Sequence, residues 1–259
     1  MRFKLTVEYA GTRYRGWQKQ PNARTVQGEL ERAVVGALGD VLVDSQGSGR
    51  TDAGVHALAQ VAHIDLTRAP APAQLRRRIN DELPADIHVI DAVPVSRTFH
   101  ARHSAVSRSY VYQLSRRRSA FAKPFVWWVK APLDLDAMRL GAGAFPGMHD
   151  FRAFSEDDPA EKSTRVLLDE VCVQEFGALV VVRVVGSHFL WKMVRRMVGV
   201  LAAVGTGDLA PDDVAALLDD GRSDLPARLT APAAGLFLEH VRYEGDPVFA
   251  ALTPAVLVR

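Results

Sequence analysis

The sequence has little cysteine and no long apolar run. Its 259 residues include a single cysteine, Cys172, which excludes an internal disulfide and a metal site made of clustered cysteines. No stretch of about eighteen consecutive apolar residues occurs, so we expect no membrane span. The first residues alternate between polar and apolar and lack the apolar core of a signal peptide. These absences predict a cytoplasmic protein without a membrane partner.

The chain also lacks a large excess of charge of one sign. Lysine and arginine total 32, aspartate and glutamate total 30, and the formal net charge is +2 at pH 7. The total charge therefore does not indicate a nucleic-acid partner, but the distribution of arginine does. Arginines cluster near aromatic residues at 76–78, 102–108, 116–118 and 195–196. Because guanidinium groups bind phosphate and aromatic rings stack on bases, these clusters favour RNA.

Hydrophobic periodicity predicts a mixture of strands and helices. Alternation over residues 2–9 is typical of a half-buried strand. Thr25 suits the N-cap of a helix that runs to about Leu38, and Asp134 that of a helix over 135–144. Further strands are expected at 41–45, 58–66, 87–92, 107–114, 125–131, 167–175, 178–186 and 235–243, and further helices at 72–82, 188–204 and 211–219.

This order of elements predicts an α+β fold with a mixed or antiparallel sheet. A weak break near 100–106 divides the chain into an N-terminal part, 1–104, and a C-terminal part, 105–259. The polar stretch 145–165 lacks a clear period, so we expect it to be an irregular and mobile loop.

Residues 47–57, Gly-Ser-Gly-Arg-Thr-Asp-Ala-Gly-Val-His-Ala, place three glycines around one carboxylate, Asp52. Glycine permits positive φ and close backbone approach, so such a run forms a tight loop that can lie against a ligand. Asp52 could close an Asx turn, which is the usual place of an aspartate in a glycine loop. A carboxylate held in this way could also act as a nucleophile or a general base.

The glycine loop does not match a phosphate-binding motif. The third glycine of a dinucleotide-binding motif would have to stand at position 52, and no Lys-Ser or Lys-Thr pair follows the loop. A metal site made of Asp44, Asp52 and His56 stays open as an alternative, although the spacing of these residues is not a ligand motif.

Residues 189–199, Phe-Leu-Trp-Lys-Met-Val-Arg-Arg-Met-Val-Gly, set two arginines in an apolar helix. Helical geometry places Arg196 beside Phe189 and Met193, and turns Arg195 another way. A guanidinium on such a helix tends to be partly buried, and a buried guanidinium needs a carboxylate partner. The distant Asp52 is one candidate for that partner.

Two further segments carry aromatic and amide groups. Tyr110 and Tyr112 share one face of the strand 107–114, either as a cross-strand aromatic pair or as a platform for a base. The loop 14–21, Tyr-Arg-Gly-Trp-Gln-Lys-Gln-Pro, contains Trp17 and Gln18 among basic groups. A loop of this composition can grip a nucleic-acid backbone.

In order and spacing, these motifs resemble those of the TruA family of tRNA pseudouridine synthases across nearly the whole chain. Residues 49–57, Gly-Arg-Thr-Asp-Ala-Gly-Val-His-Ala, are similar to the catalytic loop of that family. The other matching segments are 16–20 with 25–27, 99–102 followed by Tyr110, 149–151, 193–195 and 235–238.

The resemblance implies roles for individual residues. Asp52 would be the catalytic carboxylate that isomerises uridine to pseudouridine, and Arg195 would pair with it and hold it ionised. Tyr110 would stack on the flipped uracil and could accept the proton from C5. Arg50 would help to displace the target base from the stem. The remaining substrate-binding residues would be Trp17, Gln18, His56 and Arg102.

The family further implies a central mixed, largely antiparallel sheet flanked by helices and loops and built from two similar α+β halves. It also implies a homodimer that binds tRNA. The expected targets are uridines 38, 39 and 40 of the anticodon stem-loop, in conventional tRNA numbering. Isomerisation involves no redox change and no net hydrolysis, so neither a cofactor nor a metal is expected.

Two other functions stay as alternatives. An RNA-binding module could have kept this fold and lost catalysis, which the joint presence of Asp52, Tyr110 and Arg195 disfavours. A metal-dependent hydrolase could use Asp44, Asp52 and His56, and its activity would then depend on a removable metal ion.

Overall fold

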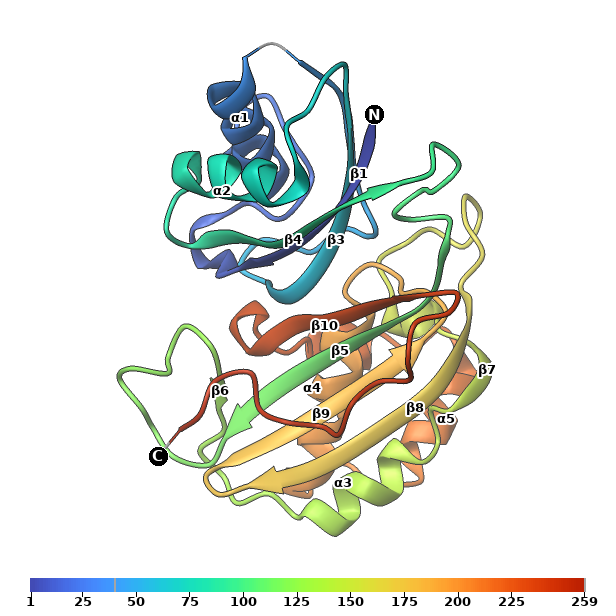
Figure 1. The fold of residues 1–259 in the computed structure, drawn as a ribbon. Helices are drawn as coiled ribbons and strands as arrows, with labels where there is room; N and C mark the ends of the chain where they lie inside the picture. The colour runs from blue at the N-terminus through green and yellow to red at the C-terminus, as the bar shows by residue number, and fades with distance from the viewer. Residues whose placement is uncertain (40, 259) are drawn as a thin grey trace. The chain divides into compact units, whose positions relative to one another are not determined.

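The computed structural model describes residues 1–39 and 41–258, which fold into two compact units (Figure 1). The N-terminal unit contains Met1–Val106 and Leu238–Val248. The C-terminal unit contains Ser107–Phe237 and the residues from Phe249 onward. Among the described residues, no helix combines the length and the apolar character that crossing a membrane would require.

The N-terminal unit is built on an antiparallel sheet. Strand β1 (Arg2–Tyr9) lies between β3 (His56–Leu66) and β4 (Ile87–Val95). Strand β2 (Leu42–Gly47) pairs with residues 62–66 at the C-terminal end of β3. The last strand, β10 (Leu236–Tyr243), returns to this unit beside β3. The predicted apolar face of β1 is buried along its whole length, which confirms that strand.

Two helices pack with this sheet, and both have the expected bounds. Helix α1 (Val26–Leu38) begins after Thr25, whose hydroxyl accepts a hydrogen bond from the Gly28 N–H. Helix α2 (Pro72–Glu82) begins with a proline, which suits a first turn because proline lacks the N–H that would be unpaired there. Helix α2 packs against α1 and β4 and buries Leu75 and Ile79 completely.

The C-terminal unit contains a second set of antiparallel strands. Their order is β5 (Ala105–Ser115), β9 (Leu179–Gly186), β8 (Arg165–Phe176) and β7 (Gly147–Asp150). The short β6 (Trp127–Trp128) runs parallel to the end of β5, which makes the pairing mixed. The structure thus confirms the predicted α+β class with a mixed, mostly antiparallel sheet.

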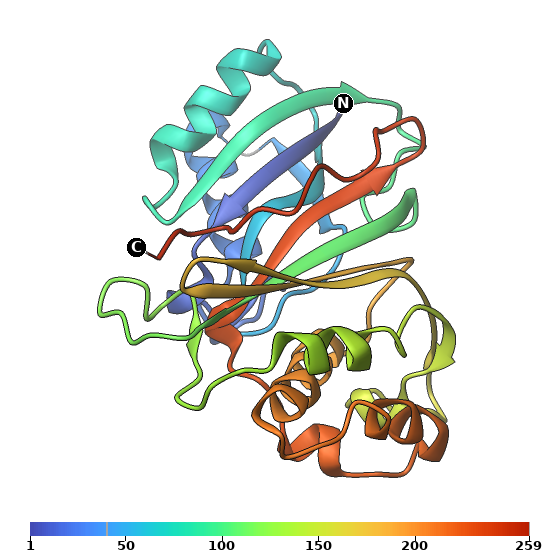
Figure 2. The ribbon, with the colours of Figure 1, turned by 90° about the horizontal axis from the view of Figure 1, so that it is seen from below.

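The helices of the C-terminal unit gather beside its strands (Figure 2). Helix α3 (Leu135–Ala142) packs on β8 and on α4 (Met193–Thr206), with Asp134 capping α3 as predicted. Helix α5 (Asp213–Asp220) contacts α3, and the short α6 (Leu225–Arg228) contacts α4. Helix α4 is almost wholly buried, so it forms the core of this unit.

The first half of the stretch 145–165 differs from the irregular loop that we predicted, whereas residues 155–164 contain no helix or strand, as expected. The first half contains β7 and a 3₁₀ turn over Arg152–Phe154. The side chains of Phe145, Phe151 and Phe154 are fully buried, and their rings lie 5.5–6.3 Å apart. Apolar anchors spaced several residues apart follow neither the helical nor the strand period, so the sequence pattern did not reveal them.

Two other bounds also differ from the expectation. Strand β6 covers only Trp127–Trp128 of the predicted 125–131. Helix α4 begins at Met193 rather than near 188 because Lys192 adopts a left-handed conformation, with φ of 62°. It is the only residue other than glycine with positive φ in the described part of the chain.

Candidate active site

The glycine loop connects β2 to β3 and presents Asp52. Gly47 at the end of β2 pairs with Ala62 of β3, and this is the last pair between the two strands before the loop. Within the loop, the Val55 N–H donates to the Asp52 carbonyl oxygen at 3.1 Å, which closes a turn with Gly54 at φ of 80°. Asp52 is half-buried, whereas the neighbouring Ala53 is exposed.

The backbone of Gly16 lies directly against this loop. A Cβ atom at Gly16 would stand 2.5 Å from the Thr51 carbonyl oxygen, and φ is +91°. The Trp17 N–H donates to that oxygen at 3.1 Å, and the Gly54 N–H donates to the Tyr14 carbonyl oxygen at 3.3 Å. Only glycine permits both this approach and this φ, so Gly16 sets the distance between the two loops.

Trp17 and His56 support the loop from inside the N-terminal unit. Each is 1% exposed. The Gly11 N–H donates to His56 Nδ1 at 3.0 Å, and a Cβ at Gly47 would meet the Trp17 indole nitrogen at 2.4 Å. We expected both side chains to contact substrate, and their burial instead favours a supporting role.

Gln60 of β3 holds the other end of the loop. Its side chain is fully buried, its Oε1 accepts from the Ser48 hydroxyl at 2.6 Å, and its Nε2 donates to the Gly49 carbonyl oxygen at 3.1 Å. Gln60 lies outside all the sequence motifs that predicted site residues. A long polar side chain inside an apolar strand pattern was the signal that could have identified it.

An open groove of about 640 Å³ lies on the N-terminal unit beside the glycine loop. Its lining includes four of the residues proposed to bind substrate, namely the exposed Arg50, Gln18 and Arg102 and the buried Trp17. The Gln18 amide donates to Gln27 Oε1 at 2.9 Å, which ties the loop 14–21 to helix α1. The groove therefore combines cationic and amide groups with the carboxylates of Glu31 and Asp44.

Three histidine rings in edge-on and tilted contact, here called the histidine stack, hold the segment that bears Arg102. The ring centroids of His63 and His100 lie 4.8 Å apart, and those of His100 and His103 lie 4.3 Å apart. His100 Nδ1 accepts from the Arg102 N–H at 3.1 Å, and His63 Nδ1 accepts from the Ala101 N–H at 3.2 Å. These bonds require the neutral form at both Nδ1 atoms.

The environment of the two rings also favours the neutral form. Burial lowers the pKa of His63, followed by the charges of Arg2 and His100. Burial lowers the pKa of His100 as well, followed by the charges of His103 and Arg2. The remaining charged groups that face one ring or the other are Asp44, Asp65 and Arg102.

Tyr110 and Tyr112 have different surroundings in the C-terminal unit. Tyr112 is fully buried, and its hydroxyl donates to the Pro232 carbonyl oxygen at 2.7 Å. Tyr110 is 8% exposed and meets Phe189 edge to face, with 4.8 Å between the ring centroids. Tyr112 is therefore structural, and Tyr110 keeps some exposed surface beside an aromatic neighbour.

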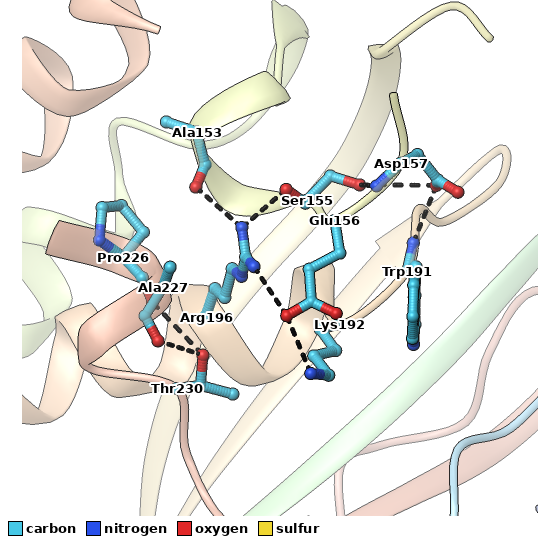
Figure 3. A network of polar contacts seen from close by, with 10 residues as sticks. All are labelled: Ala153, Ser155, Glu156, Asp157, Trp191, Lys192, Arg196, Pro226, Ala227 and Thr230. Atoms are coloured by element: carbon cyan, nitrogen blue, oxygen red, sulfur yellow. Dashed lines mark hydrogen bonds and ion pairs between the residues drawn. The ribbon is translucent and has the colours of Figure 1, made fainter. Parts of the chain in front are cut away.

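The two arginines of helix α4 also differ. Arg196 is 5% exposed, and its Nη1 donates to the carbonyl oxygens of Ala153 and Ser155 at 3.2 and 2.6 Å (Figure 3). Its Nη2 bonds Glu156 at 3.1 Å, and Lys192 reaches the same carboxylate at 2.8 Å. The buried guanidinium that needs a carboxylate is thus Arg196, and its partner is Glu156, which the sequence analysis missed.

Arg195 lies on a more open side of helix α4. It is half-buried, and its Nε donates to the Ala231 carbonyl oxygen at 2.8 Å. This bond fixes the direction of the Arg195 guanidinium, which is less buried than that of Arg196.

The metal alternative gains no support from the geometry. Within residues 1–39 and 41–258, no three or more histidine, cysteine, aspartate or glutamate side chains form a group that could hold a metal ion. The proposed set of Asp44, Asp52 and His56 is therefore not brought together as a ligand cluster.

Comparison with known proteins decides the family. A family model described as tRNA pseudouridine synthase matches residues 5–104 and 142–244. The chain belongs to the tRNA pseudouridine synthase family. Both matched segments contain site candidates, since the first includes Asp52 and the second Arg195.

Curated relatives of this family are similar over nearly their whole length. The chain is 43% identical to tRNA pseudouridine synthase A of Pelobacter propionicus, over 93% of this chain and 98% of that protein. It is 42% identical to the protein of that name from Paramagnetospirillum magneticum, over 95% and 96%. It is 43% identical to that from Nitrobacter hamburgensis, over 93% and 99%. These matches confirm the TruA resemblance and the isomerase class.

The contact between Gly16 and the glycine loop yields a first prediction for this family member. Gly16→Ala should lower turnover of tRNA at least about 100-fold, because a shift of about 1 Å in a catalytic loop can cost that much. Tritium release from tRNA labelled at uridine C5 measures this rate.

Gly39→Ala is the matched control. Gly39 also has positive φ, at +80°, but no atom lies within 4 Å of its Cβ position. Both variants should lose stability from backbone strain at positive φ, Gly16→Ala the more because its Cβ also meets the Thr51 carbonyl oxygen, and only Gly16→Ala should lose activity. Equal turnover in the two variants would contradict the positioning role of Gly16.

The histidine stack predicts a pH-dependent stability. An unfolded histidine has a pKa near 6.5, and the folded pKa values of His63 and His100 lie lower. Below about pH 6.5 the unfolded chain therefore binds more protons than the folded one, so this part of the stability is present above pH 6.5 and declines toward pH 5. Urea denaturation at a series of pH values measures the decline.

His100→Asn should make that decline shallower, because the amide oxygen can accept in place of Nδ1 and does not titrate. His88→Asn removes an exposed histidine from β4 of the same unit and should leave the decline unchanged. The same pH dependence in wild type and His100→Asn would refute the role of the stack.

Proposed function

We propose that this synthase isomerises uridine to pseudouridine at positions 38, 39 and 40 of the tRNA anticodon stem-loop, with Asp52 as the catalytic carboxylate on a flipped-out base. The main structural observation behind this proposal is that Gly16 and Gln60 hold the Asp52 loop from two sides. Such support preorganises the half-buried carboxylate in a loop that lines the groove through Gly49 and Arg50.

The chemistry fits this set of groups. The N1–C1′ bond of the uridine breaks, the uracil turns, a C5–C1′ bond forms, the proton on C5 is released, and N1 takes up a proton from solvent. The base has to leave the helical stack before a carboxylate can reach it, which costs a few kcal/mol. In this proposal Arg50, from the rim of the groove, occupies the space that the base leaves.

The remaining catalytic roles follow the family resemblance. Tyr110 stacks on the extruded uracil and takes the proton from C5. Arg195 holds Asp52 ionised, and the bond from its Nε to the Ala231 carbonyl oxygen keeps the guanidinium oriented. Gln18 and Arg102 bind the RNA backbone, while Trp17 and His56 position the loops that carry these groups.

The assembly that we propose is a homodimer bound to tRNA in the cytoplasm, without a cofactor. The named relatives are tRNA pseudouridine synthases A, which supports tRNA as the substrate of this chain.

Tritium release from tRNA labelled at uridine C5, with EDTA present, tests the reaction and the role of Asp52. We expect release by the wild type and by Asp44→Asn, and release at background level by Asp52→Asn with its tRNA affinity nearly unchanged. Loss of activity in EDTA, or in Asp44→Asn, would support the metal-dependent alternative. Tight tRNA binding by the wild type without release would support the RNA-binding module.

The two arginines of α4 provide a second test. Arg195→Met should lower kcat while leaving the urea midpoint close to that of the wild type, because Arg195 is only half-buried. Arg196→Met should lower stability by about 3 kcal/mol, because the carbonyl oxygens of Ala153 and Ser155 lose buried donors.

Arg195→Lys keeps the positive charge and should recover part of the kcat that Arg195→Met loses. Wild-type kcat in Arg195→Met would contradict a catalytic role for Arg195. A stable and active Arg196→Met would contradict our account of the buried network.

A further inference from the structure

The structure separates the arginine clusters by their burial. Arg196 is enclosed by backbone carbonyl oxygens and Glu156. Arg108 is 9% exposed and donates to the Ser187 carbonyl oxygen at 2.8 Å. These two guanidinium groups already bind partners inside the C-terminal unit, so they are not available as phosphate ligands. In that unit, the cluster at 116–118 stays at the surface.

This cluster begins the β5–β6 loop, residues 116–126, whose base is firmly held. The Ser115 hydroxyl donates to the Arg117 carbonyl oxygen at 2.7 Å, and the Val129 N–H donates to the Ser115 carbonyl oxygen at 3.0 Å. Ser115 is fully buried, so the loop starts from a rigid point. In Figures 1 and 2 the loop, drawn in green, extends outward beyond the end of β5.

The turn within the loop directs one aromatic ring into solvent. Ala122 is 4% exposed, its N–H donates to the Ser119 hydroxyl at 3.2 Å, and its carbonyl oxygen accepts from the Phe125 N–H at 2.8 Å. The adjacent Phe121 is 95% exposed. Because an anchored turn rather than a frayed end exposes this phenyl ring, it is presented to a partner at a fixed place.

Cations surround the aromatic groups of this segment. Arg117, Arg118, Lys123 and Lys130 are exposed, and none of them forms an ion pair with any residue in 1–39 or 41–258. The Arg118 guanidinium lies 5.8 Å and the Lys130 ammonium 5.6 Å from the ring centroid of Trp128, which is 37% exposed. Arg116 differs, because it pairs with Glu175.

We propose that the β5–β6 loop, together with Trp128 and Lys130, is an RNA-binding surface separate from the groove beside Asp52. Its cations contact phosphates, and Phe121 stacks on an unpaired base. Unpaired cations interleaved with open aromatic rings are the combination that binds single-stranded or looped RNA. The proposal rests on the proposed function, since it assigns a second contact to the same tRNA.

Binding of unmodified tRNA to the full-length protein, measured over a series of salt concentrations, tests this surface. Phe121→Ala should weaken binding about 5- to 150-fold, the range found for loss of one base–aromatic stack. The triple variant Arg117→Gln, Arg118→Gln, Lys123→Gln should reduce the slope of log Kd against log salt by about two. Both should raise KM for tRNA with kcat unchanged.

Matched controls come from the same unit. Leu140→Ala removes an exposed apolar side chain from α3, where Leu140 is 70% exposed, and Arg165→Gln removes an exposed arginine from β8. Both should bind tRNA like the wild type. Phe121→Trp keeps a stacking ring and should restore the affinity that Phe121→Ala loses.

The outcomes distinguish this proposal from the proposed function. Absence of tritium release and of tRNA binding in the wild type would overturn both. Wild-type activity together with unchanged Kd, salt slope and KM in the loop variants would overturn the loop proposal alone. A changed sedimentation coefficient in Phe121→Ala, with unchanged tRNA binding, would instead assign Phe121 to contact between copies of this chain and would also overturn it.

Discussion

The contact between the Gly16 backbone and the Thr51 carbonyl oxygen controls the geometry of the N-terminal unit around Asp52. A hydrogen bond from the Trp17 N–H to this oxygen, and one from Gly54 to Tyr14, join two loops that lie far apart in the sequence. Because Gly16 has no side chain, the loops can approach until these bonds form. The place of Asp52 thus depends on a residue that has no functional group of its own.

Buried polar side chains then hold what this contact brings together. Gln60 satisfies the Ser48 hydroxyl and the Gly49 carbonyl oxygen, and His56 accepts the Gly11 N–H. His63 and His100 accept hydrogen bonds from the backbone N–H groups of Ala101 and Arg102. Each buried donor or acceptor costs free energy when its partner is removed, so the loops near Asp52 resist displacement even though they lack regular structure.

In the C-terminal unit, burial assigns different tasks to chemically identical groups. Arg196 is surrounded by carbonyl oxygens and Glu156, whereas Arg195 keeps partial exposure one residue away. Lys192 and Arg196 together lower the pKa of the Glu156 carboxyl. The hydrogen bond from Lys192 has the largest effect, and the charges of Lys192 and Arg196 add to it. The same division separates the buried Arg108 from the exposed arginines of the β5–β6 loop.

The sequence by itself determined the α+β class, strand β1, the bounds of α1 and α2 and the caps at Thr25 and Asp134, because these depend on local periodicity and on hydrogen bonds between residues near in the chain. It also determined the family, because the motifs around Asp52, Tyr110 and Arg195 are specific. Only the tertiary structure decided that Arg196 rather than Arg195 is the deeply buried guanidinium, that Trp17 and His56 are enclosed, and that Phe145, Phe151 and Phe154 are buried. The physical reason is that burial depends on contacts between distant segments, and a local pattern does not contain them.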